Sequence, residues 1–222
     1  MIGMTKQILV IATKNSGKSA EIKGILKDFP ILVKDLNDFG PIPEPVEDGE
    51  TFEENAYKKA SFTARVLGLP ALADDSGLLV EALSGAPGVH SARYAGPGAT
   101  DLENNAKLLN ALSGKENRKA RFCCVLSLAV PGGAALTYEA FCDGVILDAP
   151  RGENGFGYDP LFLYPPLGKT FAEMSMEQKL SVSHRGLALG EFKKEFEKIL
   201  LWLRQRRAEE EMRRGAGEMC VR

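Results

Sequence analysis

The sequence predicts an α/β protein built on a mixed sheet, and three observations support this fold class. An apolar run at residues 8–12 is followed by a polar turn and then by apolar residues at helical spacing, which is the order of an α/β unit. A second apolar run, at 70–74, follows another helical pattern. Later in the chain, runs at 121–130 and 134–147 are joined by Pro131-Gly132-Gly133, which indicates an antiparallel hairpin. The sheet is therefore expected to be parallel early and antiparallel later.

The first half of the chain contains two predicted helices. The first follows the polar turn at 13–18, and its apolar residues have the i, i+3, i+4, i+7 spacing: Ile22, Ile25, Leu26 and Phe29. The second follows an acidic, proline-containing loop at 40–50 and begins at Thr51-x-x-Glu54, the pattern of a capping box. One side of this helix carries small and apolar residues: Ala56, Ala60, Ala64 and Leu67. Strands are expected at 31–33 and 70–74, and the apolar character resumes at 78–83.

The second half begins with a glycine- and proline-rich loop at 85–88. Thr100-x-x-Glu103 is a second capping box and predicts a helix to about Leu112. The last helix is expected from Ser183, a favourable N-cap, with one apolar face formed by Leu189, Phe192, Phe196, Ile199 and Leu203. Beyond Arg204 the chain loses its apolar period. Residues 1–204 are therefore predicted to form a single domain, and residues 205–222 a polar, frayed tail.

The composition excludes several classes of protein. The chain has 222 residues, of which 44% are hydrophobic and 26% charged, as in ordinary globular domains. A net charge of -2 argues against a protein that binds a nucleic-acid polymer mainly by electrostatics. No apolar stretch approaches the roughly 20 residues needed to span a bilayer, so no membrane partner is expected.

The cysteines and the N-terminus bear on cellular location. The segment 1–7 is too short and polar ahead of the first strand to be a signal peptide. The four cysteines show no CxxC spacing, which is typical of small buried residues in a reducing compartment rather than of disulfides: Cys123, Cys124, Cys142 and Cys220. We therefore expect a cytoplasmic protein.

Two adjacent carboxylates, Asp74 and Asp75, end the apolar run at 70–74 and precede a small-residue turn, Ser76-Gly77. Burying an ionised carboxylate is costly unless a cation or hydrogen-bond donors meet it. The pair therefore indicates a metal site or a proton-transfer site at the end of a buried strand. Helix capping or pairing with surface lysines explains the two residues equally well at this point.

The loop at 13–18 lies between a strand and a helix and ends in Gly17-Lys18-Ser19. A Walker-type phosphate loop would require glycine five residues before Gly17, and that position is Ala12, so a nucleotide kinase is disfavoured. A polar loop with Asn15 and Lys18 at a helix N-terminus still makes a good anion site. The alternative is a helix cap provided by Asn15 or Ser16, with Lys18 exposed.

Acidic and aromatic residues elsewhere complete a candidate nucleotide site. Magnesium commonly binds through one or two carboxylates plus substrate phosphates, and Glu47 in the acidic loop could join the aspartates. Glu53 and Glu54 are better explained as favourable charges at a helix N-terminus. In the segment 155–160, Phe156 between two glycines could stack on a planar base, or could simply belong to a tight turn. His184 and Arg185 follow the N-cap of the last helix, and Arg185 offers fixed donors.

Taken together, these segments resemble the inosine/xanthosine triphosphate pyrophosphatase family. The resemblance covers nearly the whole chain and rests on six motifs in order: Thr13-x-Asn15-x-x-Lys18, Thr51-Phe52-x-Glu54-Asn55-Ala56, Ala73-Asp74-Asp75-Ser76-Gly77, Gly85-x-Pro87-Gly88-x-x-Ser91-Ala92-Arg93-Tyr94, the segment 155–160, and Ser183-His184-Arg185. It implies an elongated α/β fold with a long mixed central sheet flanked by helices, and a cleft between two lobes. It also implies a homodimer that uses Mg²⁺ to hydrolyse ITP, dITP or XTP to the monophosphate and pyrophosphate.

The resemblance also implies roles for single residues. Asp75 would be the general base and a magnesium ligand, Glu47 the second ligand, and Asp74 a support through hydrogen bonds or an outer-sphere role. Substrate would be bound by the remaining matched residues, with Lys18 on the phosphates: Thr13, Lys14, Asn15, Ser16, Gly17, Lys18, Ser76, Phe156, Gly157, Tyr158, Asp159, Lys179, His184 and Arg185. Donors facing the purine C6 position would accept a carbonyl and leave the amino group of adenine unpaired.

Two other functions remain as alternatives at this point. A P-loop-like nucleotide kinase would transfer a phosphoryl group to an acceptor, and Ala12 argues against it. A non-catalytic nucleotide-binding module would bind the same ligands without turnover, and Asp75→Asn would then leave no activity to lose.

Overall fold

The structure, a computed structural model, describes residues 7–43 and 45–219 of the chain. Its strands form one seven-stranded mixed sheet in the order β2-β1-β3-β4-β5-β6-β7. The strands are β1 (Gln7–Ile11), β2 (Ile31–Asp35), β3 (Ala71–Val80), β4 (Lys119–Ala129), β5 (Ala135–Ile146), β6 (Phe162–Tyr164) and β7 (Lys169–Thr170). β1 pairs in parallel with β2 and β3, and the pairs from β3 onward are antiparallel. The predicted mixed sheet is confirmed.

Helices cover both faces of this sheet. They are α1 (Ser16–Leu26), α2 (Phe52–Leu67), α3 (Asp101–Ala111), α4 (Met176–Val182), α5 (His184–Lys194) and α6 (Phe196–Met219). Short 3₁₀ turns join them: η1 (Leu36–Asp38), η2 (Glu81–Leu83), η3 (Gly88–Arg93), η4 (Pro165–Leu167) and η5 (Phe171–Glu173). One core cluster joins α1, α5 and α6 to one face of the sheet, and another joins α2 to the opposite face.

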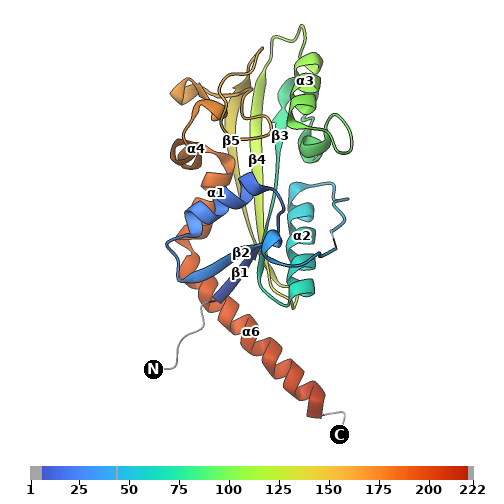
Figure 1. The fold of residues 1–222 in the computed structure, drawn as a ribbon, viewed down its shortest axis with the longest axis vertical. Coiled ribbons are helices and arrows are strands. Elements are labelled where there is room, and N and C mark those ends of the chain that lie inside the picture. The colour runs from blue at the N-terminus through green and yellow to red at the C-terminus, as the bar shows by residue number, and fades with distance from the viewer. Residues whose placement is uncertain (1–6, 44, 220–222) are drawn as a thin grey trace.

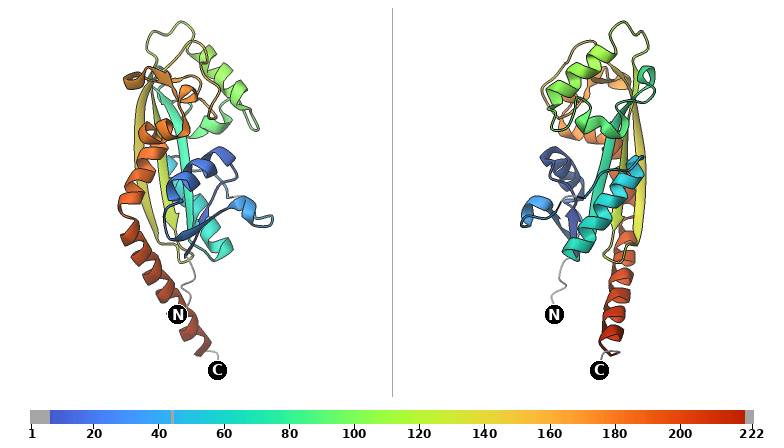
Figure 2. Two further views of the ribbon diagram at one scale, coloured as in Figure 1. Left: turned by 60° about the vertical axis from the view of Figure 1, so that its left-hand side comes forward. Right: turned by 90° about the vertical axis from the view of Figure 1, so that its right-hand side faces the viewer.

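The molecule is elongated, as Figure 1 shows, because β4 and β5 run through most of its length. One lobe contains β1, β2, α1 and α2, and the other contains α3, α4 and the loops around them. Figure 2 shows the same long strands from two further sides, with α3 at the end of the sheet away from β1. Residues from both lobes can therefore meet only near the middle of the sheet.

The predicted beginnings of the helices agree with the structure. Thr51 and Thr100 are N-caps whose side chains accept the backbone N–H three residues later. At α3 both halves of the capping box form. At α2 only one half forms, because the Glu54 carboxylate accepts the backbone N–H of Glu50 instead. Satisfying these otherwise unpaired N–H groups fixes where each helix starts.

The prediction that the strand ends at Asp74, ahead of a turn at Ser76-Gly77, is wrong. β3 continues to Val80, so Ser76 and Gly77 lie inside the strand and form no turn. Position 77 needs a glycine because of packing and not because of a turn. A Cβ there would lie 2.5 Å from the carbonyl oxygen of Gly88 and 2.6 Å from Ser91 Oγ. Close packing of η3 on the strand therefore requires the glycine.

The C-terminal region differs from the sequence prediction in two ways. The single expected helix is two, because the chain bends at Glu195 between α5 and α6, although both bury the same apolar face. The residues expected to form a frayed tail continue α6 as far as Met219, and this part of the helix projects from the body (Figure 1). Beyond Arg204, where the apolar face of α6 ends, ion pairs at helical spacing support the helix: Arg206–Glu209 and Arg207–Glu211.

The remaining sequence observations fit the fold. Cys123, Cys124 and Cys142 are free and buried, as expected for small core residues. Glu44 of the acidic loop and Cys220 lie outside the described residues. Within the part of the chain that the structure describes, no helix is long and apolar enough to cross a membrane.

Candidate active site

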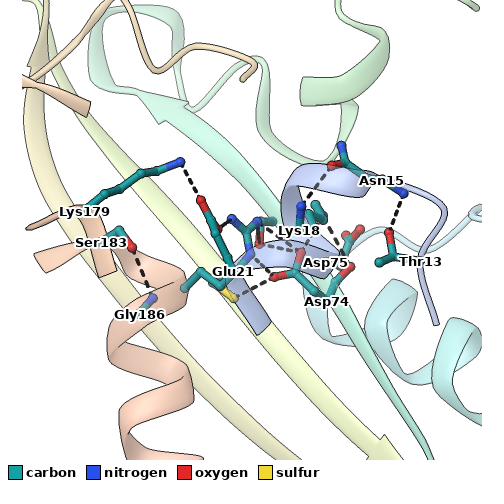
Figure 3. Close-up of polar contacts among 12 residues, drawn as sticks. Thr13, Asn15, Lys18, Glu21, Asp74, Asp75, Lys179, Ser183 and Gly186 are labelled. Carbon is teal, nitrogen blue, oxygen red and sulfur yellow. Dashed lines mark hydrogen bonds and ion pairs between the residues drawn. The ribbon is translucent and has the colours of Figure 1, made fainter. Parts of the chain in front are cut away.

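The loop between β1 and α1 is organised by its own polar side chains. The Thr13 hydroxyl accepts the backbone N–H of Asn15 at 3.1 Å, and Asn15 Oδ1 accepts the backbone N–H of Lys18 at 3.0 Å. Asn15 is thus the N-cap of α1, one of the two caps considered from the sequence. Lys18 is not an exposed lysine, because its Nζ reaches the carboxylate of Asp74 on β3 (Figure 3).

The two aspartates lie in the middle of β3 and point to opposite faces of the sheet, as strand alternation predicts. Asp74 faces α5, where its Oδ2 accepts Arg185 Nε at 2.7 Å and lies 3.1 Å from Cys124 Sγ. Asp75 faces α2, where its Oδ1 accepts Lys59 Nζ at 2.6 Å. Two neighbouring carboxylates therefore serve two separate environments.

The electrostatics of the two aspartates also differ. Burial alone would raise the pKa of Asp74, but Arg185 and Lys18 overcome it and hold that pKa well below the ordinary value. For Asp75, burial outweighs the opposing effect of Lys59 and raises the pKa. Asp74 is thus a firmly ionised structural counter-charge. Asp75 is a carboxylate that can hold a proton more readily.

A chain of buried ion pairs extends from Asp74 toward the other lobe. Arg185 also bonds Glu21 of α1 at 2.5 Å, and Lys179 reaches Asp159 at 2.7 Å. Between them, the second oxygen of Glu21 accepts Lys179 Nζ at 2.7 Å (Figure 3). Despite burial, the two cations lower the pKa of Glu21. Because a buried charge left without a partner costs several kcal/mol, the network fixes these side chains relative to one another.

A cavity of about 120 Å³ opens beside this network, between the two lobes. Its polar lining includes Asn15, Lys18 and Lys179, and the Phe156 ring lies 4.6 Å from Lys179 Nζ and 5.6 Å from Arg185 Cζ. The ring packs so closely on the α1 loop that a Cβ on Gly17 would lie 2.6 Å from it. An aromatic face beside fixed cations suits a planar base attached to an anionic group.

His184 forms one wall of the cavity. Its ring stacks on Phe122 with centroids 4.6 Å apart and planes 9° from parallel. Burial, and after it the positive charge of Arg185, lowers the pKa of His184 far below the ordinary value. The imidazole is therefore neutral and contributes a flat stacking surface rather than charge.

The residues on the α2 side fit a divalent cation. Lys59 Nζ lies 2.6 Å from Asp75 Oδ1 and 3.3 Å from Glu47 Oε2, so two carboxylates converge on one positive group. Among the described residues, no cluster of three or more acidic, histidine or cysteine side chains could hold a metal alone. Two carboxylates are nevertheless the usual protein contribution to magnesium, with substrate phosphates and water supplying the rest.

The structure brings together most of the predicted site residues. Those that line the cavity are Asn15, Lys18, Ser76, Phe156, Gly157, Tyr158, Asp159, Lys179, His184 and Arg185. Thr13 and Lys14 belong to the loop at its edge, and Ser16 and Gly17 begin α1; none of these four lines the cavity. Asp75 and Glu47 lie on the α2 side of β3. The predicted site is thus two adjoining regions separated by one strand.

Sequence reasoning missed three charged or polar members of this arrangement: Glu21, Lys59 and Asp101. Lys59 carried a usable signal, because it falls on the same helical side as Ala56, Ala60 and Ala64, where a charge must find a buried partner. Glu21 sits beside the apolar stripe of α1, and its two cationic partners are more than 150 residues away in the chain.

Comparison with known proteins agrees with this geometry. Residues 9–195 match the model of the Ham1 family. The chain is 71% identical over 219 residues to a protein of Syntrophobacter fumaroxidans named dITP/XTP pyrophosphatase, with 98% of this chain and 94% of that protein covered. A protein of the same name from Desulfotalea psychrophila is 61% identical over 203 residues, with 91% of each chain covered.

The solved structures give the same result. A HAM1 protein from Coxiella burnetii superposes with a TM-score of 0.80 at 43% identity, covering 86% of this chain and 99% of that one. The Staphylococcus aureus Ham1 protein superposes with a TM-score of 0.78 at 42% identity, with the same coverage of each chain. A family match over most of the length, high identity to full-length relatives and a shared fold lead to one conclusion. The chain belongs to the Ham1 family.

Proposed function

We propose that this protein hydrolyses deaminated purine nucleoside triphosphates, namely ITP, dITP and XTP, to the monophosphate and pyrophosphate. The names of the relatives support this activity. The structural observation that supports it most is that β3 presents different groups on its two faces. The aromatic and cationic groups of the cavity lie on one face, and Asp75, a carboxylate with a raised pKa, lies on the other. Substrate bound across the strand would meet both regions at once.

In this proposal Lys18 contacts the phosphates and Ser76 contacts the substrate beside them. Asp75 acts as the general base on the attacking water, a role that its raised pKa suits because it can take up a proton near neutral pH more easily than an ordinary carboxylate. Lys59, bonded to Asp75 and to the carbonyl oxygen of Asp74, holds the carboxylate in place. Glu47 and Asp75 would hold Mg²⁺, which when bound would neutralise charge on the triphosphate.

Base selection is proposed to follow from hydrogen bonding. Arg185 and the backbone amides of the 155–159 loop would donate to the C6 carbonyl of inosine or xanthine, whereas adenine would place its amino donor against them. The carboxylate of Asp159 accepts the backbone N–H of Phe156 at 2.9 Å and so fixes part of that loop. An unpaired buried donor costs roughly 1–3 kcal/mol, enough for about a ten- to hundredfold preference.

The test is product analysis. The protein is incubated with ITP, XTP, dITP, GTP and ATP in the presence of Mg²⁺, and pyrophosphate and orthophosphate are quantified separately. Pyrophosphate from the deaminated nucleotides, with EDTA abolishing its release, is the expected result. Orthophosphate as the main product would refute the proposal in favour of a phosphatase.

We further propose that the protein is a cytoplasmic homodimer. The three free, buried cysteines are compatible with a reducing compartment. A groove of about 900 Å³ beside β5 has the exposed side chains of Phe141 and Leu187 in its lining, and a second copy of the chain could cover them. Light scattering should give twice the monomer mass of 24.1 kDa, and Phe141→Asp should lower it if this groove is the interface.

A further inference from the structure

The glycine-rich loop at 155–159 is held at one residue, Gly157, whose backbone N–H and carbonyl oxygen are both hydrogen-bonded. The backbone N–H of Gly157 donates to Asp101 Oδ2 at 2.6 Å, and its carbonyl oxygen accepts Asn105 Nδ2 at 3.0 Å. Asp101 and Asn105 are four residues apart on α3 and therefore lie on one side of the helix. Together they form a clamp on a single backbone unit.

The helix that carries this clamp is itself fixed. Thr100 and Glu103 form a complete capping box at its start, and Leu108 is fully buried in the core. Asn104, in the first turn, accepts the backbone N–H of Ala95 at 2.7 Å and donates to the carbonyl oxygen of Ala92 at 3.2 Å. α3 is therefore a rigid reference to which the loop is tied.

The residues on both sides of Gly157 form the wall of the cavity. Phe156 precedes it, and Tyr158 and Asp159 follow it, and all three line the cavity. Gly157 has a φ of 62°, a left-handed conformation that reverses the chain at this point. Because Phe156 is joined directly to the clamped residue, the clamp sets the position of its ring.

We propose that Asp101 and Asn105 are positioning residues that fix the 155–159 loop and thereby set the discrimination between 6-oxo and 6-amino purines. They act through Gly157 and not through direct contact with the reacting atoms. This inference rests on the proposed function, because it assigns residues to the base selectivity of that reaction. Without the clamp, the loop would no longer hold its donors against a 6-oxo group, and selectivity would fall before turnover does.

The decisive variant is Asn105→Asp, which keeps the size of the side chain but places a carboxylate oxygen against the carbonyl oxygen of Gly157. Losing one such bond should raise the KM for ITP roughly tenfold and leave kcat within about twofold. The value of kcat/KM for ATP should stay unchanged, so the ratio between ITP and ATP should fall by about the same factor. Asp101→Ala should act similarly, and Asp101→Asn, which retains an acceptor, should restore most of the ratio.

The matched control is Glu103→Ala, which removes the half of the capping box that the Glu103 carboxylate forms, without touching Gly157. If it lowers the ratio as much as Asn105→Asp, the effect comes from helix stability and the inference is wrong. Parallel losses for ITP and ATP in the clamp variants would overturn it as well.

Hydrogen exchange of the 155–159 segment, followed by mass spectrometry, provides a readout independent of catalysis. The clamp variants should exchange faster in this segment, and Glu103→Ala should not. Wild-type protein that releases no pyrophosphate from ITP would refute the proposed function, whatever the exchange shows. An active wild type whose clamp variants exchange faster but keep their selectivity would refute the positioning role alone.

Discussion

At the scale of single residues, the two neighbouring aspartates predict opposite consequences of the same substitution. A carboxyl whose pKa is lowered by its surroundings stabilises the folded protein through its charge, and one whose pKa is raised does not. Asp74 belongs to the first kind and Asp75 to the second. Asp74→Asn should therefore destabilise the protein strongly, on the order of 3–5 kcal/mol, because Lys18 would lose its buried partner and Arg185 one of its two.

Asp75→Asn should destabilise the protein less than Asp74→Asn, because Lys59 keeps Glu47 and the carbonyl oxygen of Asp74 as partners. It should abolish most of the activity, by a factor on the order of 10²–10⁴ for a lost general base. Urea unfolding without added divalent metal measures the first quantity, and pyrophosphate release from ITP measures the second. The reverse order, with an active Asp75→Asn and a fully stable Asp74→Asn, would contradict these assignments.

At the scale of elements, Asp35 links α1, β2 and η1 and makes stability depend on acid pH. It accepts Ser19 Oγ and Lys23 Nζ, each at 2.6 Å, and the backbone N–H of Asn37 at 2.9 Å. Burial would raise its pKa, but these bonds lower it from 3.8 to about 2. Because the folded pKa is the lower one, the stabilisation is complete above about pH 4 and is lost as the pH falls toward 2.

Asp35→Asn should therefore lower the free energy of unfolding by about 2 kcal/mol at pH 6, and the difference from wild type should shrink between pH 4 and pH 2. Urea unfolding of both proteins across this range measures the difference. A gap that stays constant down to pH 2 would show that the hydrogen bonds, and not the charge, account for the contribution of Asp35.

The helices and strands also show which parts of the fold could be predicted from the sequence. Periodicity and caps predicted α1, α2, α3 and the β4–β5 hairpin, because each depends on neighbours in the chain. The continuation of β3 through Ser76 and Gly77 could not be predicted, because it depends on η3 packing against Gly77. The bend at Glu195 could not be predicted either, because α5 and α6 share one apolar face and the apolar spacing continues through the bend.

At the scale of the whole molecule, the sequence indicates candidate site residues but not the ion pairs that join them. The resemblance implied Lys18, Asp75, Lys179 and Arg185, but Glu21, which joins the last two, has no local signature and could be recognised only in the folded chain. Long-range ion pairs of this kind are set by the overall fold. A single sequence can therefore indicate the residues but not which of them pair.

The part of α6 that projects from the body should be dispensable for the chemistry (Figure 2). A chain ending at Arg204 keeps Phe196, Ile199 and Leu203, which pack in the core, and removes the surface ion pairs beyond them, each worth about 0.5 kcal/mol or less. Its kcat and KM for ITP should equal those of the full chain. A large loss of activity with retained folding, checked by circular dichroism, would assign the projecting helix a functional role.

The placement of Asp74 and Asp75 on consecutive residues of β3 has a consequence for how this enzyme could change over time. One residue of rise, about 3.4 Å, separates the region proposed to hold the base from the region that holds the proposed hydrolytic carboxylate. Any displacement of the strand moves both regions together. Substrate range and catalytic rate are therefore coupled traits, and a lineage that broadens one by shifting β3 must re-optimise the other.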